Sequence, residues 1–115
     1  RKILSQQNMK VSVMTVRVPV YNAHAEAVWV TLDREAKREQ IISCLEAAPG
    51  LVVDSGIKSY STQRQVSGKD PVYVGRIHQD LNDPKTWIMW IVSDNIRKGA
   101  ALNGIQIAEK MRAFK

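Results

Sequence analysis

The chain has 115 residues, which is enough for one domain of ordinary size and too few for two. Hydrophobic residues make up 44% of it, but no apolar run approaches the roughly 18 residues that a membrane span needs. Its 17 basic and 11 acidic side chains give a formal charge of +6, which suits an anionic partner or, equally, a solvated basic surface.

The N-terminal part predicts the tail of a helix and then a strand. Residues 1–4 start without methionine and are typical of the end of a helix, so we expect a fragment of a longer chain. Residues 9–20 alternate and are rich in β-branched side chains, which favours a strand. Pro19 should end this strand or place it at a sheet edge, because proline donates no ladder hydrogen bond.

A second strand and a helix follow a short connection. Residues 25–32 alternate, with Val28 and Val30 on one face, and predict a strand. Residues 35–48 carry apolar side chains at helical spacing, and the predicted helix ends at Pro49-Gly50.

The second half of the chain predicts three strands and a last helix. The strands are expected at 51–53, 72–78 and 86–92, with a long irregular stretch at 55–70. The helix is expected at 97–114, and its predicted inner stripe consists of Ala101, Ile105, Ala108 and Met111.

Two of these strands make specific predictions about sheet faces. Alternation in the strand at 72–78 places Val74 opposite the face that carries Tyr73 and Ile77. The strand at 86–92 is apolar without alternation, which indicates that both of its faces are covered. We expect a partner domain or subunit to cover the face that carries Trp87, Met89 and Ile91.

The order strand-strand-helix-strand-strand-strand-helix predicts a single α+β domain over 1–115. We expect a mixed, mostly antiparallel sheet with helices on one face. The chain has no internal repeat and no low-complexity stretch.

Several chemistries find no support in the sequence. No glycine-rich nucleotide-binding or phosphate loop is present, and His24, His78 and Cys44 do not have metal-ligand spacing. Cys44 lies at a helical position that suggests a structural role, and one cysteine cannot form a disulfide framework, so we expect a cytoplasmic protein. The basic clusters lack interleaved aromatic side chains, so no nucleic-acid partner is expected. No membrane partner is expected either, because no apolar run is long enough to span a bilayer.

Arg17 and His24 are the candidate site residues. Arg17 ends the predicted first strand, where its guanidinium needs an anion: a substrate carboxylate or a salt-bridge partner. His24 lies in the connection to the next strand, where it is either a proton-transfer group or a hydrogen-bonded turn residue. A tight reversal between the two strands would place both side chains at one mouth of the sheet.

Three blocks in the chain resemble bacterial aspartate-semialdehyde dehydrogenases. Residues 16–28 resemble the family stretch R-V-P-V-x-x-x-H-S-E-A-V, with Ala25 in place of the serine. Residues 70–77 resemble D-x-V-x-V-G-R-I, and residues 93–103 resemble D-N-L-R-K-G-A-A-x-N. Residues 47–53 fit the family's joint between helix and strand.

This resemblance implies the C-terminal, dimerising domain of an enzyme of amino-acid biosynthesis, with a fold similar to the C-terminal domain of glyceraldehyde-phosphate dehydrogenases. The intact enzyme would use NADPH to convert aspartyl phosphate into aspartate semialdehyde and phosphate, on the route to lysine, threonine and methionine. Its nucleophilic cysteine and its NADP-binding Rossmann domain would lie outside these residues, so the fragment would be inert alone. We expect a homodimer or tetramer.

The resemblance also implies roles for four residues. Arg17 would bind the substrate α-carboxylate, and His24 would be the acid/base catalyst. Lys2 falls where the family has a phosphate-binding lysine, and Asn95 aligns with a residue near the nicotinamide carboxamide. Two alternatives remain open: a non-catalytic paralogue that only pairs or binds, and a relative that acts on N-acetylglutamyl phosphate.

Overall fold

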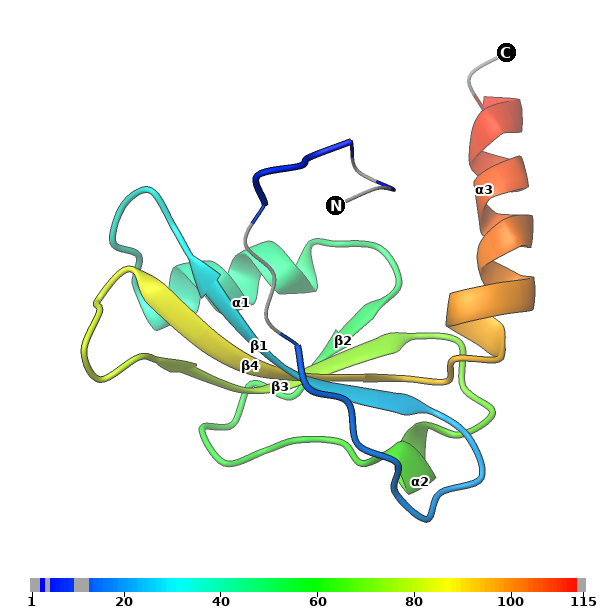
Figure 1. Cartoon of the computed structure of the whole chain (residues 1–115), viewed down its shortest axis with the longest axis horizontal. Coiled ribbons are helices and arrows are strands. Elements are labelled where there is room, and N and C mark those ends of the chain that lie inside the picture. Colours follow the sequence, from blue (N-terminus) through cyan, green and yellow to red (C-terminus); the bar gives the residue numbers. More distant parts are fainter. Residues whose placement is uncertain (1–2, 4, 10–12, 114–115) are drawn as a thin grey trace.

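The computed structural model of the chain describes residues 3, 5–9 and 13–113 and is built around a four-stranded sheet (Figure 1). The strand order is β1-β4-β3-β2. β4 pairs antiparallel with both β1 and β3, whereas β2 pairs parallel with β3, so the predicted mixed and mostly antiparallel sheet is confirmed. The strands are β1 (His24–Thr31), β2 (Leu51–Val53), β3 (Val72–Gln79) and β4 (Thr86–Ser93).

The helices differ in how they contact the sheet. Helix α1 lies along one face of the sheet, whereas α3 stands at the end of β4 and extends away from it (Figure 1). A short helix, α2, lies within the stretch predicted to be irregular. In the described part of the chain, no helix has the length and apolarity needed to cross a membrane. The helical elements are α1 (Arg38–Glu46), α2 (Gln63–Val66), the π-helix η1 (Arg97–Ala101) and α3 (Leu102–Ala113).

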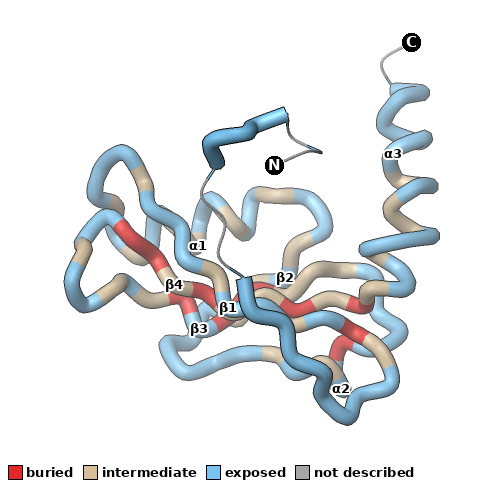
Figure 2. The backbone as a smooth tube through the Cα atoms, viewed as in Figure 1, coloured by how far each residue is buried: buried red, intermediate tan, exposed pale blue. Residues whose placement is uncertain are grey.

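The hydrophobic core lies between α1 and the sheet. Trp87 and Met89 of β4 are buried there with Val74 and Ile77 of β3. Apolar side chains of α1 pack against these residues and complete the core. Figure 2 shows that the buried residues concentrate along the central strands. Trp87, Met89 and Ile91 are therefore covered by α1 of the same domain, and the prediction that a partner covers them was wrong. The α1 side chains in this layer are Ile41, Ile42 and Leu45.

The opposite face of the sheet, which we call the open face, is covered at one end only. There Val66 of α2 packs on Val92, and the indole Nε1 of Trp90 donates a hydrogen bond to the carbonyl oxygen of Ser61 at 3.0 Å. Further along the strands, Trp29 is 59% exposed. The open face is defined by Ala27 and Trp29 of β1, Ile88 and Trp90 of β4, Arg76 and His78 of β3, and Tyr60.

Gly75 allows the loop before α2 to approach β3. A Cβ atom at Gly75 would lie 2.7 Å from the carbonyl oxygen of Ser59 and 2.8 Å from the Cα of Tyr60. Both are backbone atoms, so a larger residue would push the loop away from the strand.

We therefore expect Gly75→Ala to lower the free energy of unfolding by about 1–3 kcal/mol through overpacking. Gly104 provides a matched control, because a Cβ there meets nothing within 4 Å. Gly104→Ala should stabilise α3 by about 1 kcal/mol through helix propensity. Urea unfolding of both variants tests the pair, and equal effects of the two substitutions would contradict the close-approach argument.

A β-bulge in β3 changes which side chains share a face. Arg76 and Ile77 together stand opposite Met89, and Arg76 has a positive φ of 53°. Ile77 consequently packs with Val74 in the core, so the prediction that it shares a face with Tyr73 was wrong. The guanidinium of Arg38 donates to the carbonyl oxygen of Ile77 at 2.9 Å and so ties α1 to the bulge.

Two further sequence predictions were wrong. Among the described residues of the predicted first strand, 13–20 have no regular secondary structure, and β1 pairs only with β4. This segment has strand-forming side chains, but its backbone has no paired neighbour in the sheet. The predicted inner stripe of α3 is not buried either, because Ile105 is 58% and Met111 68% exposed.

Candidate functional site

The candidate site lies where the turn before β1 meets the segment after β4. The strand ladder ends with the pair His24 and Ser93, and side chains continue the contact beyond it. The amide N–H of Ala23 donates to Oδ1 of Asn95 at 2.7 Å. Nδ2 of Asn22 donates to Oδ2 of Asp94 at 2.6 Å. Two consecutive side chains after β4 therefore hold two consecutive residues before β1.

Ala23 gives this turn its shape. It is 6% exposed and has a φ of 78°, in the left-handed region that alanine seldom adopts. The bond from its N–H to Asn95 and its packing against Val66 and Val92 hold it there. His24 follows directly, and its side chain is exposed. The turn thus presents an exposed imidazole, while the contacts of Ala23 hold the backbone next to it in place.

Asp94 is the most highly bonded carboxylate of the site and is 2% exposed. Besides Asn22, its oxygens accept hydrogen bonds from the backbone N–H groups of Gly68 at 2.7 Å, Ile96 at 2.9 Å and Arg97 at 3.3 Å. The Gly68 bond, followed by those from Ile96 and Arg97, lowers the pKa of Asp94 against the opposing effect of its burial. The carboxylate is therefore ionised at neutral pH.

The basic side chains that follow Asn95 are engaged within the domain. The Arg97 guanidinium forms a salt bridge with Asp70, which raises the pKa of Arg97. Nζ of Lys98 donates to Oε1 of Gln106 at 2.7 Å. Both cations therefore already have a partner within the domain.

Of the four predicted site residues, the structure brings two together, places one in a separate segment and does not describe the fourth. His24 and Asn95 lie at the same junction, one on each side of Ala23. Arg17 is exposed in the irregular segment before β1, and within the described residues it has no hydrogen-bond or ion-pair partner. The strand-to-strand reversal expected to join Arg17 to His24 is not formed, because residues 13–22 do not pair with β1. Lys2 lies outside the described residues.

Asp94 and Asn22 were missed as functional candidates. Their bond joins residues that are 72 positions apart in the chain, so no local spacing predicts it. The available signal was an aspartate directly after a buried strand and before a helix, a position from which it can bond free N–H groups.

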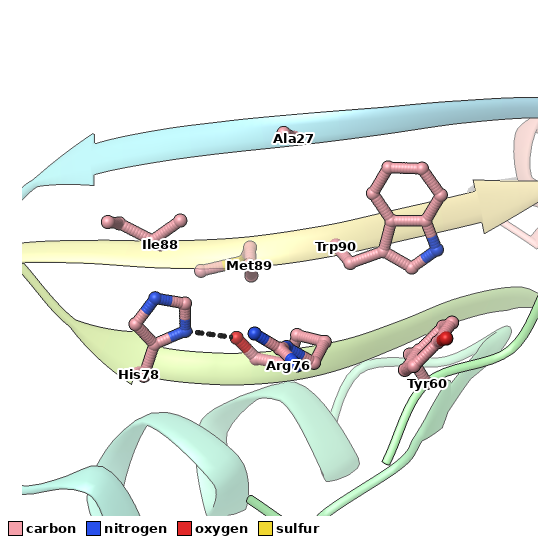
Figure 3. Close-up of a pocket in the computed structure, with 7 residues that line it drawn as sticks. All are labelled: Ala27, Tyr60, Arg76, His78, Ile88, Met89 and Trp90. Carbon is pink, nitrogen blue, oxygen red and sulfur yellow. Dashed lines mark hydrogen bonds between the residues drawn. The ribbon is translucent and has the colours of Figure 1, made fainter. Parts of the chain in front are cut away.

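The open face carries a shallow pocket of about 310 Å³, to which β1 contributes Ala27 (Figure 3). Its walls come from three strands and the loop before α2, and most of them are apolar. Nδ1 of His78 lies 2.6 Å from the carbonyl oxygen of Arg76, so this imidazole points along the strand. The surface of the pocket is mostly apolar, although Tyr60, Arg76 and His78 also line it.

Cys44 is an exposed free thiol on α1, not a core side chain. Among residues 3, 5–9 and 13–113, no three histidine, cysteine or acidic side chains are grouped so that they could hold a metal ion.

Comparison with known proteins gives this fold and site a family. A family model described as semialdehyde dehydrogenase, dimerisation domain, matches residues 1–98. The chain therefore belongs to the semialdehyde dehydrogenase family, as a dimerisation domain.

The individual relatives are more specific. The chain is 42% identical over 110 residues to the aspartate-semialdehyde dehydrogenase of Shewanella violacea and 46% identical over 112 residues to that of Legionella pneumophila. Each match covers 95% of this chain and 32% of the relative, so the chain spans about a third of the length of the curated relatives it matches.

Solved structures agree. The crystal structure of aspartate-semialdehyde dehydrogenase II complexed with ASA from Vibrio cholerae superposes with a TM-score of 0.76 and 44% identity, over 81% of this chain and 28% of that chain. An aspartate-semialdehyde dehydrogenase described as probable, from Pseudomonas aeruginosa, superposes with a TM-score of 0.71 and 32% identity.

Proposed function

We propose that this chain is the substrate-binding and dimerisation domain of a cytoplasmic aspartate-semialdehyde dehydrogenase. In that role it operates with an NADP-binding Rossmann domain and a cysteine nucleophile from the rest of a longer chain. The full enzyme reduces L-4-aspartyl phosphate to L-aspartate 4-semialdehyde and releases phosphate. The observation that carries the proposal is the fixed turn that presents His24, in a chain more than 40% identical to enzymes of this name.

His24 is the proton-transfer group in this proposal. Its imidazole is exposed, and histidine is the side chain that most often transfers protons in enzymes. The substrate carbonyl oxygen gains negative charge when a thiolate attacks the neighbouring carbon. An imidazolium beside that oxygen supplies the proton, and the imidazole takes it back when the carbonyl re-forms.

Arg17 is the carboxylate-binding group. Its guanidinium is exposed and, within the described residues, has no acidic partner, so it is available for an external anion. A planar guanidinium binds a carboxylate through two parallel hydrogen bonds, which fixes the orientation as well as the position of an amino-acid substrate. Lys2 is proposed as a contact to the substrate phosphate.

Asn95 suits a contact to the nicotinamide of NADP. Its Oδ1 accepts the bond from Ala23, and this bond orients the side-chain amide. Within the described residues its Nδ2 group has no partner and can donate to a carboxamide oxygen. NADPH, held mainly by the other domain, supplies the reducing equivalents, and Asn95 would orient its reactive ring.

An activity assay tests the proposed function. The full-length gene product should show NADP- and phosphate-dependent oxidation of aspartate semialdehyde, followed as NADPH absorbance. The isolated 115 residues should show no turnover, because the proposed thiol is supplied from outside them. A full-length protein that folds, pairs and lacks this activity would instead be a non-catalytic paralogue. Selective turnover of the N-acetylglutamate analogue would identify the other branch.

The open face is the proposed surface of dimerisation, and its occupant is the open face of a second copy. Its pocket is mostly apolar and Trp29 of the same face is exposed, so an isologous interface would remove this apolar surface from water. The matching family is defined by a dimerisation domain, and α1 already covers the other face of the sheet.

We expect Ala27→Glu to convert the dimer into a monomer, because it places a large charged side chain in the mostly apolar pocket of this surface. Ala27 is exposed within one copy, so the fold of the monomer should survive. Leu81→Glu is the matched control, since Leu81 is 99% exposed and does not line the pocket. Sedimentation analysis measures the mass of both variants, and a dimeric Ala27→Glu protein would exclude this face as the interface.

A further inference from the structure

We propose that Asp94 is a positioning residue, which sets where the His24 imidazole lies by holding the turn before β1 against the start of the C-terminal helical segment. This inference rests on the proposed function, since it concerns the same site. It assigns a role to a buried carboxylate whose hydrogen bonds go to other parts of the same chain.

The bonds of Asp94 show what it holds together. Oδ2 accepts from Nδ2 of Asn22 and from the N–H of Gly68, and Oδ1 accepts from the N–H groups of Ile96 and Arg97. These donors come from three separate segments: the turn before β1, the turn after α2 and the first turn of η1. One carboxylate thus joins the parts of the chain that surround the site.

The connection from Asp94 to His24 is short. Asn22 is bonded on both sides, because its Oδ1 accepts a hydrogen bond from the hydroxyl of Ser67 at 2.6 Å while its Nδ2 donates to Asp94. The next residue, Ala23, has the left-handed φ of 78° that turns the chain into β1. His24 follows directly, so a shift in the position of Asn22 would move Ala23 and, with it, the proposed catalytic side chain of His24.

Asn95 makes the second contact to the same turn through its bond from Ala23. Asp94 also fixes the position of Asn95, because both its side chain and its backbone carbonyl oxygen accept hydrogen bonds from the first turn of η1. The N–H of Lys98 donates to that carbonyl oxygen at 2.9 Å. Asp94 therefore fixes the two sides of the junction relative to each other. On the proposed function, these sides carry the proton-transfer group and the nicotinamide contact.

The test uses Asp94→Asn in the full-length enzyme. This substitution replaces an acceptor oxygen by an NH₂ group that faces N–H donors, so the turn loses its fixed place. We expect kcat to fall about 10- to 100-fold, since small misplacements of a catalytic group have effects of this size. The KM for aspartate semialdehyde should change by less than about 3-fold, because Arg17 lies outside the clamped turn.

Two further variants separate positioning from general destabilisation. Asn22→Ala removes the link to the turn but leaves the backbone bonds of Asp94, and it should reproduce the fall in kcat. Asp70→Asn makes the same chemical change at an exposed salt bridge with Arg97, and it should retain kcat within about 2-fold. In a His24→Asn background, Asn22→Ala should lower kcat by less than about 2-fold more, because Asn22 acts on the turn that carries His24.

Hydrogen exchange provides a readout that does not depend on activity. Exchange of the peptide that spans the turn should accelerate in the Asp94 and Asn22 variants and not in the Asp70 variant. If Asp94→Asn does not fold, Asn22→Ala decides the question. A wild-type kcat in both Asp94→Asn and Asn22→Ala would overturn the positioning role. An inactive wild-type enzyme would instead overturn the proposed function, and hydrogen exchange alone would then test whether Asp94 holds the turn.

Discussion

Replacing His24 by asparagine in the full-length enzyme should lower kcat by about 10²- to 10⁴-fold, the usual contribution of a positioned acid/base group. Asparagine keeps the polar character and approximate size of the side chain but cannot exchange a proton near neutral pH. Because the turn is held by Ala23 and Asn22, the backbone should keep its place. The KM should therefore change little, and steady-state kinetics with aspartate semialdehyde, NADP and phosphate will show both values.

Cys44→Ser is a suitable control for this measurement. Cys44 is the single cysteine of the chain and is exposed on α1, away from the junction of β1 and η1. The serine variant should retain kcat, which would also agree with a nucleophile supplied from outside these residues. A His24→Asn enzyme with undiminished kcat would end the assignment of proton transfer to this imidazole.

Replacing Arg17 by leucine should raise the KM for aspartate semialdehyde about 10- to 100-fold, because charge-assisted hydrogen bonds to the substrate carboxylate are lost. The effect on kcat should be smaller, since the carboxylate does not change in the reaction. Arg17→Lys should recover part of the loss, because lysine keeps the charge but not the two parallel bonds.

Arg34→Leu serves as the matched control for Arg17. Arg34 is also exposed, but it lies beyond the far end of β1 from His24. Its removal alters net charge equally and should leave the KM near the wild-type value. If Arg17→Leu behaved like Arg34→Leu, a general electrostatic effect would replace the specific carboxylate contact.

The fold was predictable from the sequence where the signal is local. The strands β2, β3 and β4 and the helix α1 lie within a few residues of their predicted positions, because alternation, helical spacing and Pro49-Gly50 act over short ranges. Pairing is not local. Residues 13–20 have the composition of a strand, yet no neighbouring strand supplies hydrogen bonds to them.

The covered face of β4 could not be predicted for a related reason. An unbroken apolar run shows that both faces need cover, but it does not show which face the domain's own helix takes. Helix α1 covers Trp87 and Met89, so the exposed apolar area lies on the side of Ile88 and Trp90. Which face α1 covers depends on the direction in which the chain leaves β1, and this direction is known only from the folded structure.

The candidate site was predictable in part. Chemistry singled out Arg17 and His24, and the family resemblance added Asn95 and Lys2. Neither of these predicted Asp94, because its hydrogen bonds come from donors in distant segments of the chain. A buried carboxylate is recognised by the bonds it makes, and these are fixed only when the chain has folded.

The extra residue in β3 has a consequence for how sequences of different length can be aligned with this one. Arg76 and Ile77 share a single opposite neighbour, Met89, while the pairs before and after them remain in step. A homologous chain that is one residue shorter at this point would form a regular strand without the bulge. It would keep Ile77 beneath α1 and His78 on the outer side, and it would relieve the positive φ of Arg76. A gap of one residue here is therefore compatible with an unchanged core.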